Sequence, residues 1–241
     1  MSTINSSATH ASPRPSDDAQ APSRFQKWLP TLLSLIAGMV DLTGFLSLGN
    51  LFTAHITGNL VVIGALVVRG GRINPGQILA IPVFMIAVAT TWLIAKASGR
   101  RGPRLMSLLL LVQFLLLTGI LIFSVITKPS ANPHGLMAGI AVMMAVSAMA
   151  CQFALFRLAL PGGISTAVMT GNLTNTVLAL MDMLSQGRSL VTADAARLKR
   201  SLRLLFGFLV GCIVAAAAIS LLADWAWALP VALAAVAVAL P

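Results

Sequence analysis

The sequence predicts an all-α polytopic membrane protein with about six transmembrane helices, and two features of its composition support this. Hydrophobic residues make up 58% of the chain and charged residues only 9%, whereas soluble domains carry roughly 25% charged residues. Four runs contain no Asp, Glu, Lys or Arg: 73–95, 105–127, 129–156 and 204–223. Each is long enough to cross a hydrocarbon core, which takes about 20 helical residues. A large soluble helical bundle is therefore disfavoured.

Hydropathy divides the chain into a polar tail, six expected spans and two shorter segments. The tail, residues 1–27, is rich in Ser, Ala, Pro, Gln and Asp and has no apolar run, which predicts a disordered cytoplasmic segment. The membrane part is expected to form a first repeat, 28–127, and a second repeat, 133–241. The six spans are 28–48, 75–97, 104–127, 133–156, 203–223 and 225–241, and the shorter segments are 51–68 and 163–183.

The two shorter segments contain near copies of one another. Residues 49–60, GNLFTAHITGNL, align without a gap to residues 162–173, GGISTAVMTGNL, and seven of the twelve positions are identical. Each copy places a Thr-Gly-Asn cluster in apolar surroundings, where polar groups are costly. Internal duplication around such a polar break is typical of membrane transport proteins. The pattern indicates a class of protein and leaves its substrate open.

The Lys and Arg residues favour one topology. With a cytoplasmic N-terminus and both shorter segments re-entrant, thirteen of the sixteen basic residues lie inside, and Arg69, Arg72 and Lys128 lie outside. Eight full spans would give eleven against five, and crossing by 163–183 alone would give eight against eight. The positive-inside rule favours six spans. Three crossings then separate the two copies and make the repeats inverted, whereas the eight-span alternative would make them parallel.

Each Thr-Gly-Asn cluster is expected to begin a half-helix inside the membrane. A Thr hydroxyl can cap a helix N-terminus, Gly lets a ligand or another backbone approach closely, and the free N–H groups of the first turn suit anionic or carbonyl groups. Two inverted half-helices would meet near the midplane. The alternative is that Gly and Asn serve only close helix packing. The substrate-binding candidates are Thr57, Gly58, Asn59, Thr170, Gly171 and Asn172.

Other polar residues lie near these clusters. Asp41 is about 13 residues into the first span, or some 20 Å deep, and an intramembrane carboxylate is a candidate for coupling to protons or cations. The alternative is a hydrogen-bonded structural Asp near the outer boundary. With a two-residue gap, Gln152 takes the corresponding position in the second half. His55, which only the first copy has, and Thr174, four residues after Thr170, are secondary candidates.

The sequence offers no specific sign of an enzyme. It contains no nucleophile–base pair, Gly-rich phosphate loop, HExxH or CxxC motif, and Cys151 and Cys212 lie in separate apolar helices. We therefore expect no catalytic residue, no cofactor and no metal. The expected partners are the lipid bilayer and an unidentified small solute, while homo-oligomerisation stays open. The net charge is +10, but the basic residues lie mainly in short loops between spans, where the positive-inside rule expects them. The charge therefore does not indicate nucleic-acid binding.

Three segments, AGMVD at 37–41, FTAHITGN at 52–59 and STAVMTGNL at 165–173, resemble the YoaK-type family of bacterial inner-membrane proteins. The resemblance covers roughly residues 30–222. It implies a multi-pass protein of the bacterial inner membrane with about six spans, and it implies no activity. The leading prediction is a small-solute transporter or channel with a site between the two Thr-Gly-Asn half-helices. The alternatives are a non-transporting scaffold or sensor that acts through partners, and a membrane enzyme acting on lipid.

Overall fold

The protein is all-α throughout the part that the computed structural model describes, residues 24–69, 75–159, 169–185 and 192–240, which confirms the predicted fold class. Short 3-10 turns lie at Pro129–Ala131 (η1) and Ala223–Trp227 (η2). The helices are α1 (Arg24–Ser47), α2 (Gly58–Arg69), α3 (Pro75–Ser98), α4 (Gly102–Thr127), α5 (Leu136–Ala159), α6 (Met169–Ser185), α7 (Thr192–Leu222) and α8 (Ala228–Ala239).

Five helical segments in the described part are long and apolar enough to cross a membrane, so the protein is polytopic. They are Trp28–Ser47, Pro75–Ser98, Gly102–Thr127, Leu136–Ala159 and Leu198–Ala239. The last one contains α7 from Leu198 onward, η2 and α8, and the 12 residues of α8 span only about 18 Å at 1.5 Å per residue. The predicted sixth span, 225–241, is thus a short helix after a turn, and the count of six stays a prediction.

Helix α1 begins at Arg24, four residues before the predicted start of the first span at residue 28. Residues 1–23, Arg72 and residues 160–168 lie outside the described part. The last of these stretches includes residues 162–168, which precede the Thr-Gly-Asn cluster in the second copy. The predicted tail is therefore not tested over most of its length.

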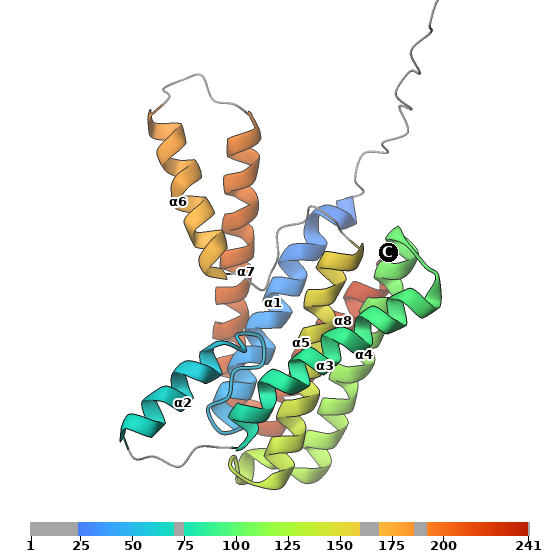
Figure 1. Ribbon diagram of the computed structural model, residues 1–241, viewed down its shortest axis with the longest axis vertical. Helices are drawn as coiled ribbons and strands as arrows, with labels where there is room; N and C mark the ends of the chain where they lie inside the picture. Colours follow the sequence, from blue (N-terminus) through green and yellow to red (C-terminus); the bar gives the residue numbers. More distant parts are fainter. Residues whose placement is uncertain (1–23, 70–74, 160–168, 186–191, 241) are drawn as a thin grey trace, which may run out of the picture.

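The bundle is built by contacts between the two halves of the chain. Helix α1 packs along α7, and α5 packs along α3 (Figure 1). Helix α4 packs on α5 and α8, and α8 also contacts α1. The first helix of each half thus packs on a helix of the other half. Helix α5 is the most deeply buried of the candidate spans, so the centre of the bundle lies around it.

Glycines bring α1 and α7 into backbone contact. A Cβ on Gly38 would overlap the carbonyl oxygen of Phe208, and one on Gly211 would overlap the carbonyl oxygen of Leu35. The Cys212 thiol also lies 3.6 Å from the Gly38 carbonyl oxygen. Small residues at such a crossing let membrane helices gain van der Waals contact that larger side chains would prevent.

Helices α2 and α6 stand apart from this bundle (Figure 1). Helix α2 packs against α3 and α6 packs against α7, and the two do not pack along one another. Their 12 and 17 residues span about 18 and 26 Å. Much of their apolar surface is exposed, including Val61 and Val68 on α2 and Leu178 and Met181 on α6. Helix α2 therefore has the length expected of a broken half-helix.

Candidate functional site

A sharp turn after α1 brings the chain back along that helix. Gly49 and Asn50 both adopt left-handed backbone conformations, with φ of 81° and 57°. The Asn50 N–H donates to the Phe45 carbonyl at 3.0 Å, the six-residue closure that ends many helices at glycine. Further along, a Cβ on Gly44 would lie 2.7 Å from the Thr53 side chain. The non-helical residues 48–57 can therefore lie directly against the last turns of α1.

Asp41 holds this segment from the interior of the protein. Its Oδ1 accepts hydrogen bonds from the backbone N–H groups of Thr53 at 2.7 Å and Ala54 at 2.8 Å. Its Oδ2 lies 2.7 Å from Nδ1 of His55. Asp41 is only 4% exposed, so the carboxylate faces protein rather than lipid, as expected from its depth. The 2.7 Å distance is that of a hydrogen bond between the carboxyl group and the imidazole.

Asn59 holds the same segment from the other side. Its Oδ1 accepts from the Phe52 N–H at 2.9 Å, and its Nδ2 donates to the Phe52 carbonyl at 2.9 Å. Asn59 is fully buried. Non-helical backbone at membrane depth must find internal partners. Here the side chains of Asp41 and Asn59 supply them for Phe52, Thr53 and Ala54.

A cavity of about 470 Å³ opens beside this segment. Its walls come from α1, the non-helical loop, the start of α2 and α7, and they are mostly apolar. The Phe45 and Phe52 rings lie 4.8 Å apart between centroids, and the His55 ring meets the edge of Phe208 at 5.1 Å. The lining residues are Asp41, Leu42, Phe45, Phe52, His55, Gly58, Phe208 and Cys212.

The structure thus brings together several of the predicted site residues of the first half. Gly58, Asp41 and His55 line one cavity, and Asn59 is bonded to the Phe52 backbone beside it. Thr57 directly precedes α2 and is exposed. A Cβ on Gly58 would lie 2.9 Å from the Phe52 ring, so glycine keeps this wall of the cavity open.

The second copy is described only from Met169 onward. Helix α6 begins at that residue, so Thr170 lies in the first turn rather than before it. Asn172 is buried, while Thr170 and Thr174 are exposed. The Thr174 hydroxyl donates to the Thr170 carbonyl at 3.0 Å. The described lining of the 470 Å³ cavity includes neither Gly171 nor its neighbours, so a meeting of the two copies near the midplane stays a prediction.

Gln152 lies in a separate buried network. Its Oε1 accepts from Gln113 Nε2 at 2.7 Å, and its Nε2 donates to the Leu33 carbonyl at 2.9 Å. These bonds join α5 to α4 and to α1. Our sequence reasoning missed Gln113, although a lone amide inside the uncharged run 105–127 was a usable signal. It also missed Phe208, because a Phe in an apolar helix gives no signal of a site.

The described residues contain no group of three His, Cys, Asp or Glu side chains placed to hold a metal ion. They contain one ion pair within 4.0 Å, that of His55 and Asp41. The arrangement places a carboxyl group and an imidazole at the wall of the 470 Å³ cavity.

Comparison with known proteins gives a family and no activity. A family model described as protein of unknown function (DUF1275) matches residues 29–240. The chain is 27% identical over 155 residues to the UPF0700 transmembrane protein YoaK of Bacillus subtilis (strain 168). That alignment covers 63% of this chain and 65% of the relative, just under two thirds of the relative's length. No solved structure matches the chain significantly.

Proposed function

This chain belongs to the DUF1275 family of proteins of unknown function, and we propose that it carries a small solute across the membrane at the break between α1 and α2. The observation that supports this most is the pair of the buried Asp41 and the half-buried His55, with its 2.7 Å contact, at the wall of a cavity of about 470 Å³. Carboxylates inside membranes are expensive and commonly belong to ion or substrate pathways.

The pair supports a coupling role for Asp41. Both side chains line the cavity, but the Asp41 side chain is 5% exposed and the His55 side chain 34% exposed, so His55 is the more accessible of the two. A proton on the imidazole can therefore leave or arrive while Asp41 keeps its backbone bonds to Thr53 and Ala54. In this proposal His55 exchanges the proton and Asp41 stabilises the imidazolium form.

The cavity walls favour a particular kind of solute. Phe45, Phe52 and Phe208 offer apolar ring faces that also attract cations, and the Asp41 carboxyl group lines the same cavity. An apolar or positively charged solute fits these walls better than a phosphate or a sugar. Both polar groups of Asn59 are bonded to Phe52, so Asn59 shapes the site, while His55 lines the cavity and can contact the solute.

We further propose that the second half supplies the opposite side of the pathway through Thr170, Gly171, Asn172 and Thr174, as inverted repeats do in transporters. The reciprocal packing of α1 on α7 and of α5 on α3 supports a two-fold relation between the halves. The charge distribution supports a cytoplasmic N-terminus, and the YoaK-type resemblance supports the bacterial inner membrane. The proposal gives the protein no enzymatic role.

One observation favours the alternative, a scaffold or sensor that acts through partners. Helices α2 and α6 stand off the bundle with exposed apolar side chains, which could contact another membrane protein or a second copy. On this alternative the Thr-Gly-Asn clusters only shape the backbone.

Proteoliposomes that contain the purified full chain and an internal pH-sensitive dye would test transport. Pulses of choline, tetraethylammonium, leucine and glucose would be applied from outside. We expect an organic cation or the apolar amino acid to change the internal pH, and Asp41→Asn to abolish that change. Asp224→Asn is the matched control. Asp224 is also a buried, hydrogen-bonded carboxylate, but its partner is Ser130 and it does not line the cavity. If none of the four solutes changes the internal pH, the scaffold alternative is favoured.

A further inference from the structure

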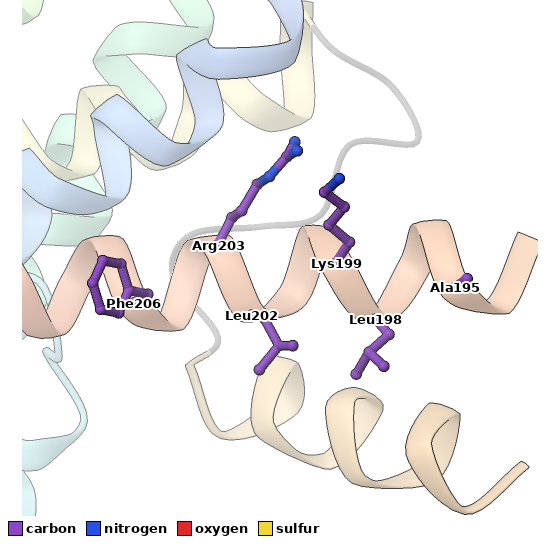
Figure 2. A pocket seen from close by; sticks show the side chains of 6 residues that line it. All are labelled: Ala195, Leu198, Lys199, Leu202, Arg203 and Phe206. Carbon is purple, nitrogen blue, oxygen red and sulfur yellow. The ribbon is translucent and has the colours of Figure 1, made fainter. Parts of the chain in front are cut away.

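A second cavity lies on the N-terminal half of α7, outside the Asp41–His55 site. It measures about 500 Å³. Its residues follow each other at spacings of three and four or in adjacent pairs, so they form one stripe along the helix. Figure 2 shows the six lining residues: Ala195, Leu198, Lys199, Leu202, Arg203 and Phe206.

The stripe has a basic side and an apolar side. In Figure 2, Lys199 and Arg203 point to one side of α7, whereas Leu198 and Leu202 point toward α6. Lys199 and Arg203 are four residues apart, so their charges lie one above the other on the same face. Leu202 and Phe206 are 47% and 68% exposed. The cavity therefore offers two cations beside an open apolar wall.

The two cations are not neutralised by the side chains that the structure describes. Within that part of the chain, the ion pair of His55 and Asp41 is the one contact between opposite charges. The guanidinium of Arg203 instead lies 5.1 Å from the centre of the Trp28 ring, at the start of the first candidate span. Trp residues concentrate at the membrane–water interface. This contact therefore indicates that Arg203 lies at the level of lipid headgroups.

We propose that this cavity binds one anionic phospholipid. The phosphate contacts Lys199 and Arg203, and an acyl chain lies along Leu202 and Phe206. A soluble phosphate would use the two cations but leave the apolar wall exposed to water. A zwitterionic lipid carries a second, positive group that the basic side repels. Charge complementarity and the apolar wall together select a phospholipid with net negative charge.

Native mass spectrometry of the full chain, purified in dodecyl maltoside with added phosphatidylglycerol, would test the site. The variant Lys199→Gln/Arg203→Gln is compared with Arg100→Gln/Arg101→Gln, which removes two exposed charges between α3 and α4. We expect phosphatidylglycerol binding to fall roughly five-fold for each charge lost at the site and to change less than two-fold in the control. Wild-type protein should retain phosphatidylglycerol over phosphatidylcholine, and excess inorganic phosphate should not displace it.

Two further variants keep the test decisive if the double substitution disturbs folding. Lys199→Gln alone changes an exposed side chain and should still lower binding, while Arg203→Lys keeps the charge and should retain it. The proposal would be overturned if the Arg100/Arg101 control lost as much phosphatidylglycerol binding as the site variant. It would also be overturned if the wild-type protein retained phosphatidylcholine equally well, or if inorganic phosphate displaced the phosphatidylglycerol.

Discussion

Asn59 and Phe52 are joined by two hydrogen bonds, both 2.9 Å long, in which the side-chain amide of Asn59 pairs with the backbone N–H and carbonyl of Phe52. The amide thus takes the place that a neighbouring strand would occupy. The Asn of the first Thr-Gly-Asn cluster therefore fixes the non-helical loop against the start of α2.

Replacing Asn59 with Leu should destabilise the protein, because it leaves both backbone groups of Phe52 without partners. Buried unsatisfied groups cost about 1–3 kcal/mol each, and a loss of about 2 kcal/mol lowers the melting temperature by roughly 4–8 °C in a chain of this size. Thermal unfolding in detergent, followed by size-exclusion fluorescence, would measure it. Val61→Ala, which changes an exposed residue of the same helix, is the control, and equal melting temperatures for the two variants would contradict a stabilising role of the Asn59–Phe52 bonds.

If the two halves are related by a repeat, Asn172→Leu should cost a similar amount. Asn172 is buried, in keeping with a role like that of Asn59. The same unfolding measurement applies, with Thr174→Val, at an exposed position, as its control. If Asn59→Leu lowers the melting temperature and Asn172→Leu leaves it unchanged, the second copy does not repeat the arrangement of the first.

Substitutions of Asp41 should separate folding from function. Asp41→Asn keeps an oxygen for the N–H groups of Thr53 and Ala54 and an amide that can donate to His55, so the fold should survive. Asp41→Leu removes every one of these bonds and should lower the yield of folded protein severalfold. Size-exclusion profiles would compare the two variants. If Asp41→Asn aggregates as Asp41→Leu does, the carboxylate charge itself is needed for the fold.

The crossing of α1 and α7 should tolerate no side chain at its two close glycines. In Gly38→Ala and Gly211→Ala the new methyl group meets a backbone carbonyl of the facing helix, and such overpacking costs about 1–3 kcal/mol. Gly64→Ala and Gly139→Ala are matched controls, because no atom lies within 4 Å of their Cβ positions. Melting temperatures should fall in the first pair and not in the second.

Labelling would test the orientation. In a Cys151→Ala/Cys212→Ala background, single cysteines at 69 and 101 would be treated in intact cells with a membrane-impermeant maleimide. The six-span topology predicts labelling at 69 and protection at 101, since α3 crosses the membrane between these two positions. The reverse pattern would refute that topology.

Composition and periodic apolar runs were enough to predict the all-α membrane fold, because long uncharged stretches have no soluble alternative. The helix break before Gly58 was also predictable, since Gly49-Asn50 and Thr-Gly-Asn interrupt an apolar run with residues that favour turns and caps. The inward direction of Asp41 followed from the cost of a lipid-facing carboxylate.

The hydrogen-bond partners of the site residues were not predictable in the same way. The pairing of Asp41 with His55, and of Asn59 with the Phe52 backbone, depends on how residues 48–57 fold back over α1. That path is set by Gly44, which admits Thr53, and by the left-handed turn at Gly49 and Asn50. The aromatic wall from Phe208 depends on the packing of α7 against α1, a contact between distant parts of the chain that no local pattern encodes.

The packing of α1 on α7 has a consequence for biosynthesis. The ribosome must complete α2 through α6 before α7 exists, so α1 leaves the translocon without its main neighbour. During that interval the Gly38 face of α1 meets lipid or a chaperone instead. The contact of α1 with α7 therefore forms late in translation, and nascent chains that stop after α6 should be recognised by membrane quality control as incomplete.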